Sequence, residues 1–135
     1  MKLILKLISY IYRLVISIRH WLFDCGFLKS HSFKTPIICV GNITVGGTGK
    51  TPHIEYIINL LKDDYAIATL SRGYRRTSKG YVKAGVGCDM RSVGDEPSQL
   101  KNKFPEITVA VDEKRVHGIE NLLKEDERPE IILLD

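Results

Sequence analysis

Cysteine is scarce in this sequence, and its spacing excludes several classes of protein. The 135 residues contain three cysteines, Cys25, Cys39 and Cys88, which lie far apart and form no Cys-x-x-Cys pair. Three cysteines cannot build the disulfide framework of a small secreted domain, and their spacing matches neither a zinc site nor a redox site. We therefore expect free, buried or half-buried thiols in a reducing compartment such as the cytoplasm.

Long uncharged apolar runs are also missing. Residues 3–23 are rich in apolar side chains, but Lys6 and Arg13 interrupt them. A membrane-spanning helix needs roughly 18 or more apolar residues that are almost free of charge. A signal peptide fits poorly too, because its apolar core would be broken and no small-residue cleavage site follows. The sequence therefore predicts neither a transmembrane span nor a secretory signal in this region.

Most of the chain lacks an excess of charge. Residues 1–35 contain six Lys and Arg and one Asp, a net charge of +5, whereas the formal net charge of the whole chain is +4. The remaining hundred residues are therefore near neutral, and no basic surface interleaved with aromatic residues indicates a nucleic-acid partner. With 44% hydrophobic residues the chain is too apolar to be disordered, and its length suits one domain. Nothing in the sequence indicates an obligate protein partner.

Residues 1–30 form the first predicted segment, an amphipathic helix over residues 3–23 that ends at Asp24 and Gly26. Its polar residues recur every three or four positions and so share one narrow face. These residues are Lys2, Lys6, Ser9, Arg13, Ser17 and His20. A narrow cationic stripe on a wide apolar helix is typical of helices that lie in the membrane interface, with their cations at anionic headgroups. The alternative is a helix packed against the rest of the protein or a partner, with its lysines reaching solvent.

Residues 36–135, which follow a linker at 30–35, alternate between strand and helix patterns. The predicted strands are residues 36–41, 65–71, 81–84, 107–111 and 130–134. We expect the first of these strands to be buried and the strand at 81–84 to lie at an edge of the sheet. The predicted helices are 51–62, 96–104 and 114–124. This alternation indicates an α/β fold with a mostly parallel sheet and helices on both faces. The last strand runs straight into Asp135, so we expect a truncated, incomplete domain.

The strongest local signal lies between the first predicted strand and the first helix of this domain. In the phosphate-binding loop G-x-x-x-x-G-K-[ST], glycines let backbone N–H groups converge on phosphates, the lysine reaches the β/γ-oxygens and the hydroxyl binds Mg²⁺. The candidate nucleotide-binding residues are Thr44, Gly46, Gly47, Thr48, Gly49, Lys50 and Thr51. Thr44 replaces the first glycine of the usual pattern, but the strand before the loop and the helix after it fit. We therefore expect a P-loop fold that binds nucleotide phosphates.

Three further patterns follow predicted strands or precede predicted helices. Asp135 ends a strand, where a carboxylate can hold Mg²⁺ directly or through water, although it could simply end the strand before a turn. Residues 71–76, Ser-Arg-Gly-Tyr-Arg-Arg, lie at the same sheet edge as the phosphate loop, and their three arginines either bind phosphate oxygens or form a solvated basic turn. Asp95, in Val-Gly-Asp-Glu-Pro, either accepts a proton from an attacking hydroxyl or caps the helix that begins at Glu96.

In combination these motifs closely resemble the tetraacyldisaccharide 4′-kinase family, the lipid A 4′-kinases. The matching stretches are residues 41–52, 71–74, 93–97 and the closing Leu-Leu-Asp135, in this order. The resemblance implies a P-loop kinase, held at anionic lipids on the cytoplasmic face of the bacterial inner membrane. It also implies that Mg-ATP phosphorylates the 4′-hydroxyl of a lipid A precursor, tetraacyldisaccharide 1-phosphate. In the family, threonine is normal at the position of Thr44.

The resemblance also implies roles for individual residues. Lys50 and Thr51 would hold the ATP phosphates and Mg²⁺, and Asp95 would be the catalytic base or one half of an acid/base pair. Asp135 would bind Mg²⁺ as the first of two adjacent aspartates. The resemblance further points to two active-site positions without a defined role, Tyr74 and Arg115. Because the second aspartate and a second domain are missing from this sequence, we do not expect the 135 residues to be catalytically active alone.

Two other functions stay open at this point. A membrane-associated P-loop ATPase switch uses a similar loop, but with lysine directly before the paired glycines, where this sequence has Val45. Such a switch would hydrolyse ATP slowly under the control of a partner and would have no lipid acceptor. The other is a non-catalytic fragment that binds only nucleotide and membrane. His31, His53 and His117 match no role in the family and are expected to be ordinary surface or helix residues.

Overall fold

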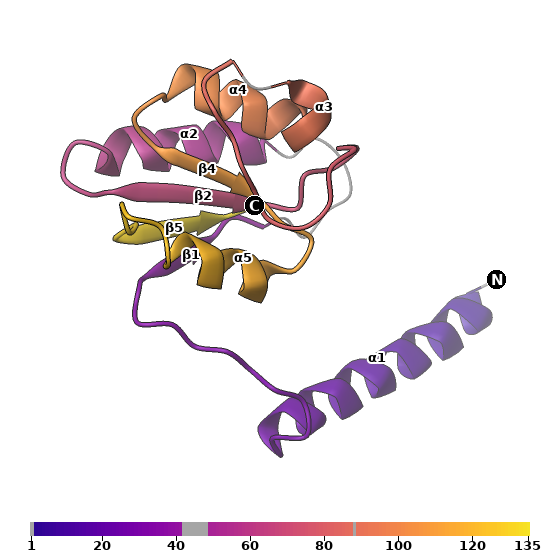
Figure 1. The fold of residues 1–135 in the computed structure, drawn as a ribbon. Helices are drawn as coiled ribbons and strands as arrows, with labels where there is room; N and C mark the ends of the chain where they lie inside the picture. The colour runs from indigo at the N-terminus through magenta and orange to yellow at the C-terminus, as the bar shows by residue number, and fades with distance from the viewer. Residues whose placement is uncertain (1, 42–48, 88) are drawn as a thin grey trace. The chain divides into compact units, whose positions relative to one another are not determined.

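The structure of the chain, a computed structural model, describes residues 2–41, 49–87 and 89–135 (Figure 1). The chain divides into two compact units, Met1–Ser32 and Phe33–Asp135. The boundary falls within the linker that the sequence predicts at residues 30–35.

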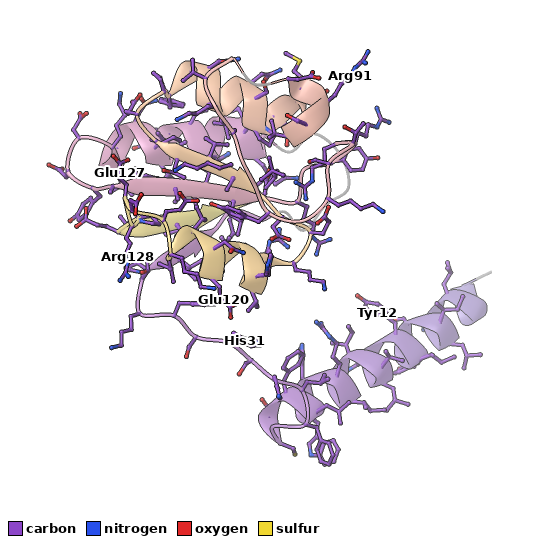
Figure 2. All side chains as sticks on the ribbon, viewed as in Figure 1. Tyr12, His31, Arg91, Glu120, Glu127 and Arg128 are labelled. Atoms are coloured by element: carbon purple, nitrogen blue, oxygen red, sulfur yellow. The ribbon has the colours of Figure 1, made fainter. Side chains whose placement is uncertain are left out.

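The first unit contains helix α1 (Lys2–Asp24), which confirms the helix predicted over residues 3–23. The helix ends where expected, because Gly26 adopts a left-handed conformation with φ of 74° that favours glycine. Many of its large apolar side chains are exposed, among them Tyr10 at 69% and Tyr12 at 68%, and Figure 2 shows Tyr12 projecting from the helix. Over the described residues, no helix combines the length and the apolar character that crossing a membrane requires.

The second unit is an α/β domain built on a five-stranded sheet. Its strands are β1 (Ile37–Cys39), β2 (Ile67–Ser71), β3 (Val82–Lys83), β4 (Thr108–Val111) and β5 (Ile131–Leu134). Its helices are α2 (Lys50–Leu61), α3 (Met90–Val93), α4 (Asp95–Lys103) and α5 (Arg115–Leu122). The sheet order is β1-β5-β2-β4-β3, with every neighbouring pair parallel except the antiparallel pair of β3 and β4. The mostly parallel sheet predicted from the sequence is therefore confirmed.

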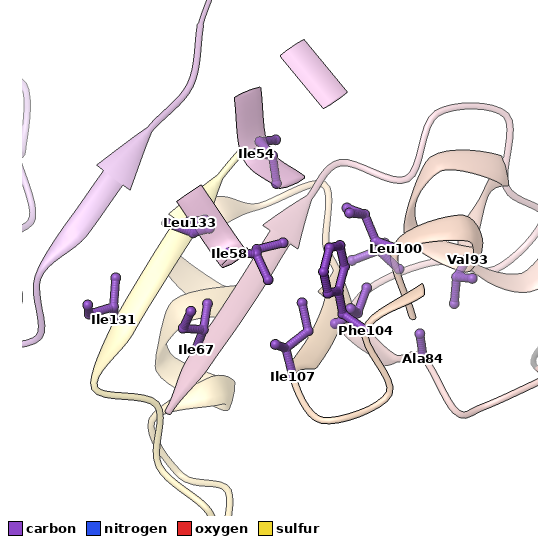
Figure 3. Close-up of a cluster of buried hydrophobic side chains, with 12 residues drawn as sticks. Ile54, Ile58, Ile67, Ala84, Val93, Leu100, Phe104, Ile107, Ile131 and Leu133 are labelled. Atoms are coloured by element: carbon purple, nitrogen blue, oxygen red, sulfur yellow. The ribbon is translucent and has the colours of Figure 1, made fainter. Parts of the chain in front are cut away.

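Helices cover both faces of this sheet, as predicted. On one face α2 and α4 pack against β2, β4 and β5, and buried side chains such as Ile54, Ile58 and Phe104 fill the space between them (Figure 3). On the other face α5 packs through Ile119 and Leu122. Many charged side chains of this unit are exposed, and Figure 2 labels four of them: Arg91, Glu120, Glu127 and Arg128.

Two expectations from the sequence are wrong. The first strand is not buried: Ile38 is 37% exposed and Cys39 is exposed. The reason is that β1 lies at the edge of the described sheet and pairs only with β5. The free thiols were expected to be buried or half-buried, but Cys25 and Cys39 are both exposed, and Cys88 lies outside the described residues.

Candidate active site

A cavity of about 430 Å³ opens at the carboxyl ends of β2 and β5, next to the first residues of α2 and α4. Its lining residues are Lys50, Ser71, Arg72, Gly73, Tyr74, Arg75, Asp95, Glu96, Pro97 and Asp135. Ligands of parallel α/β sheets bind at this edge, because the strand ends and helix N-termini converge there. Four residues singled out from separate sequence motifs therefore reach one cavity: Lys50, Tyr74, Asp95 and Asp135.

The beginning of α2 supplies the lysine of this cavity. Gly49 precedes the helix with φ of 76°, a left-handed conformation that glycine adopts without strain, and Lys50 is the first helical residue. A helix N-terminus presents free N–H groups and a positive dipole end, which suit an anion. His53 adds a contact here, with its Nδ1 atom 2.7 Å from the carbonyl oxygen of Gly49. Residues 42–48, which include the candidates Thr44, Gly46, Gly47 and Thr48, lie outside the described residues.

The end of β5 supplies the half-buried carboxylate of Asp135. The backbone N–H of Asp135 donates to the carbonyl of Leu70 at 3.2 Å, which holds the residue beside the end of β2. Its Oδ1 atom is buried and has no hydrogen-bond partner among the described residues, and the same holds for Oγ of Ser71 at the end of β2. Buried polar atoms are normally paired, so these two oxygens are suited to a ligand in the cavity. The sequence motif contained Ser71, but no role was predicted for it.

The beginning of α4 supplies two further carboxylates. Asp95 and Glu96 are exposed residues in the first turn of α4, where the helix dipole favours negative charge. The oxygen Oε1 of Glu96 accepts a hydrogen bond of 3.5 Å from Oγ1 of Thr51, so the metal-ligand candidate Thr51 lies beside the cavity. Glu96 was not predicted as a site residue.

The interpretation of Asp95 as the helix cap is wrong. The N-cap residue is Gly94, which has no side chain that could form a capping hydrogen bond, and Asp95 is already helical. Gly94 has φ of 97°, and a Cβ atom there would lie 3.2 Å from the carbonyl oxygen of Tyr74. The close approach of these two segments therefore requires glycine and moves the helix start one residue earlier than predicted.

The three arginines of the loop after β2 lie in different environments. Arg72 and Arg75 line the cavity, and the Arg75 guanidinium lies 5.3 Å from the ring centroid of Tyr74, which is 81% exposed. Arg76 fits neither of the two roles left open by the sequence, a phosphate ligand or part of a solvated turn. Its side chain is 2% exposed and forms a salt bridge of 2.7 Å with Glu113. Hydrogen bonds from the backbone N–H of Glu113 and from this guanidinium hold the pKa of the Glu113 carboxyl below its ordinary value.

Arg115 binds the backbone of Asp135, a residue that lines the cavity. It is the first residue of α5, and its Nη2 atom donates a hydrogen bond to the carbonyl oxygen of Asp135. Two residues near it were not predicted: the buried Asp112 and His117, whose side chains lie 2.6 Å apart. An aspartate directly after a strand with a histidine five positions later was the available sequence signal.

The mostly parallel sheet, the cavity at its carboxyl edge and the Gly49–Lys50 start of α2 define the class as a protein with a P-loop nucleotide-binding fold. Comparison with known proteins then identifies the family. A family model described as LpxK, tetraacyldisaccharide-1-P 4′-kinase, matches residues 1–135. The chain belongs to this family.

Individual relatives agree with this assignment. The chain is 57% identical over 129 residues to a tetraacyldisaccharide 4′-kinase of Bacteroides thetaiotaomicron, covering 95% of this chain and 34% of that protein. It is also 57% identical over 127 residues to that of Flavobacterium psychrophilum, covering 94% and 37%. The chain thus spans about a third of the length of these curated relatives.

A solved structure has the same fold. The crystal structure of an "apo" form of LpxK from Aquifex aeolicus in complex with ATP matches with a TM-score of 0.78 and 39% sequence identity. The match covers 93% of this chain and 41% of that one.

Proposed function

We propose that this chain is the nucleotide-binding part of a tetraacyldisaccharide 4′-kinase. The reaction transfers the γ-phosphoryl group of ATP to the 4′-hydroxyl of tetraacyldisaccharide 1-phosphate, a lipid A precursor. The observation that carries the proposal is the cavity that Lys50, Asp95 and Asp135 line together. The names of the relatives, and the ATP in the Aquifex aeolicus structure, support it.

The beginning of α2 would bind the nucleotide phosphates. The Lys50 ammonium would pair with the β- and γ-phosphate oxygens, and the free N–H groups at the start of α2 would bind the same phosphates. Arg72 and Arg75 border the cavity and add positive charge for a group that carries several negative charges. These side chains hold the γ-phosphorus in a fixed place, which is the larger part of catalysis in phosphoryl transfer.

Asp95 would act as the general base. The oxygen of the 4′-hydroxyl attacks the γ-phosphorus, the bond from that phosphorus to the β,γ-bridging oxygen breaks, and ADP leaves. The hydroxyl proton passes to the carboxylate of Asp95, which lines the cavity and is exposed. Exposure at the rim suits a residue that meets an acceptor arriving from outside the protein.

The donor atoms around the cavity fit Mg²⁺, which prefers hard oxygen ligands. Asp135 would hold the ion with a carboxylate whose Oδ1 is buried and lacks a partner among the described residues. Thr51 would add its hydroxyl, which lies within hydrogen-bonding distance of Glu96. When bound, Mg²⁺ neutralises charge on the transferring phosphoryl group.

The first unit would hold the enzyme at its lipid substrate. Helix α1 presents exposed apolar side chains such as Leu7, Tyr10 and Trp21, and cationic residues recur on one stripe. Such a helix binds an interface by burying its apolar arc among acyl chains and placing its cations at anionic headgroups. The proposed location is the cytoplasmic face of the bacterial inner membrane, where ATP and the acylated disaccharide meet.

The test joins this chain at residue 135 to the remaining part of the Bacteroides thetaiotaomicron relative, because the chain spans a third of that protein. With γ-labelled ATP and tetraacyldisaccharide 1-phosphate, we expect label on the lipid, and none in the same chimera carrying Lys50→Ala. ATP hydrolysis without labelled lipid would contradict the proposal and favour the ATPase switch. Nucleotide binding without either reaction would favour the non-catalytic alternative.

A further inference from the structure

Among the described residues, Asp112 is the carboxylate with the smallest exposed fraction, and both of its oxygens take part in hydrogen bonds. The residue follows β4 and is 1% exposed. Its Oδ1 atom accepts a hydrogen bond of 2.8 Å from the backbone N–H of Lys114, and its Oδ2 atom lies 2.6 Å from Nδ1 of His117. A buried carboxylate is costly unless it is paired, so the fold depends on both contacts.

His117 is oriented from its other side as well. The Asn121 amide nitrogen donates to the His117 carbonyl oxygen at 2.8 Å and lies 3.1 Å from Nε2. An amide donor at Nε2 leaves the ring proton on Nδ1, where it is donated to Asp112. The His117 side chain is nevertheless 54% exposed, so its burial contributes little to stability. The contacts with Asp112 and Asn121 therefore orient the His117 ring, which contributes little to the hydrophobic core.

These contacts fix the start of α5 on the sheet. Lys114 is the residue before the helix and has no side-chain cap of its own, so Asp112 performs the capping from two positions upstream. The helix also lies close to the sheet, because a Cβ atom at Gly118 would be 2.8 Å from Leu70 and 3.0 Å from Asp112. The first turn of α5 therefore has little freedom to shift.

Arg115 lies in that first turn and connects it to the candidate cation site. Its Nη2 atom donates to the carbonyl oxygen of Asp135, the residue whose carboxylate has a buried, unpartnered Oδ1 among the described residues. A continuous set of contacts thus runs from Asp112 through His117 and the start of α5 to Arg115 and Asp135.

We infer that Asp112 and His117 are positioning residues of the divalent-cation site. They hold the start of α5 so that Arg115 fixes the backbone of Asp135, and with it the direction of the carboxylate. The inference rests on the proposed function, in which Asp135 binds Mg²⁺. Partners outside the ligand shell commonly change metal affinity or activity by about 10- to 100-fold when removed, because ligands must be held in place.

The experiment measures binding of a fluorescent ATP analogue to the chimera that joins this chain at residue 135 to the remaining part of the Bacteroides thetaiotaomicron relative, so that the backbone oxygen of Asp135 is a peptide carbonyl. Binding is measured once with EDTA and once with saturating Mg²⁺. The ratio of the two Kd values reports how strongly the cation strengthens binding. We expect His117→Ala to lower this ratio about tenfold and to leave the Kd in EDTA unchanged. His117→Asn should keep the ratio near that of the unmodified chimera, because its amide can donate to Asp112 from nearly the position of Nδ1. The matched control is Glu120→Ala, an exposed residue of the same helix.

A double variant tests whether His117 acts through Arg115. Arg115→Gln should lower the ratio at least as far as His117→Ala does, and the double variant should lower it no further, because both changes break one pathway. Additive effects would overturn the inference. An unchanged ratio in His117→Ala would also overturn it while leaving the proposed function intact, and so would an equal loss of binding with and without Mg²⁺. An unmodified chimera that binds no nucleotide would contradict the proposed function, and the inference with it.

Discussion

At the scale of single residues, Asp95 shows how an ambiguous motif is resolved by local geometry. Both a helix cap and a catalytic base fit the segment Val-Gly-Asp-Glu-Pro. Gly94 takes the N-cap position, so Asp95 is not the capping residue, and Asp95 lines the cavity. An exposed carboxylate that lines the cavity is suited to act as a general base.

Replacing Asp95 by Asn tests this role in the chimera with the Bacteroides thetaiotaomicron relative. We expect kcat to fall by about two orders of magnitude or more, because an amide cannot take the hydroxyl proton. The KM for ATP should change little, since Lys50 and the start of α2 bind the phosphates. Steady-state kinetics with labelled ATP measures both constants.

The control for this experiment is an aspartate that does cap a helix. Asp89 precedes α3 and its Oδ1 accepts the backbone N–H of Arg91 at 3.0 Å. Asn caps about as well as Asp, so Asp89→Asn should retain nearly full turnover. Near-normal turnover of Asp95→Asn as well would rule out the general base.

Some of the site was predictable residue by residue, and some was not. Lys50 and Asp135 could be placed because a motif or a strand end fixes their position along a parallel sheet. Arg76 could not, since its partner Glu113 lies 37 positions away in the printed sequence and only the fold brings the two together. The same holds for the link from Arg115 to Asp135, which joins two elements through a backbone carbonyl that no side-chain pattern reveals.

At the scale of elements, helix α5 packs closely against the sheet at Gly118. Gly118 lies within the helix, and a Cβ atom there would approach both Cδ atoms of Leu70 to within 2.9 Å. Leu70 is fully buried, so it has little room to move away. Glycine at this position therefore permits the close approach of α5 to β2.

Gly118→Ala should lower the free energy of unfolding by about 1 kcal/mol. Overpacking a core costs roughly 1–3 kcal/mol, and replacing a helical glycine by alanine returns about 1 kcal/mol. Urea unfolding measures the difference. Gly85→Ala is the control, because nothing lies within 4 Å of a Cβ atom there. An increase in stability for Gly118→Ala would show that α5 is not held this closely.

The order of the elements was predictable from hydrophobic periodicity, whereas their burial was not. Alternating strand and helix patterns predicted the parallel sheet, since neighbouring parallel strands are usually joined by a crossover helix. The exposure of β1 depends on its edge position in the sheet, and strand order is not contained in the pattern of one strand. Helix α3 has four residues, too few to produce a helical period.

At the scale of the whole molecule, the two units divide the work proposed for the protein. We expect attachment to anionic membranes to depend on residues 1–30, and nucleotide binding to depend on the α/β unit. The exposed apolar side chains of α1 are the observation behind the first statement.

Deleting residues 1–30 should abolish cosedimentation with vesicles that contain anionic lipid. Lys6→Glu combined with Arg13→Glu should weaken binding, because each cation near the surface contributes about 1 kcal/mol. That loss should shrink as salt is raised, since surface electrostatics are screened. Undiminished binding by the deletion variant would locate membrane attachment elsewhere.

The central claim is that the start of α2 binds the phosphates of ATP, and Lys50→Ala in the 135-residue chain tests it most directly. Removing a charge-assisted phosphate contact, which contributes about 1.5–3 kcal/mol, should raise the Kd for a fluorescent ATP analogue by roughly 10- to 100-fold. Lys124→Ala, which removes an exposed lysine outside the cavity, should leave the Kd unchanged. Circular dichroism must show that both variants remain folded. A folded Lys50→Ala chain that binds the analogue as tightly as the unmodified chain would contradict the account.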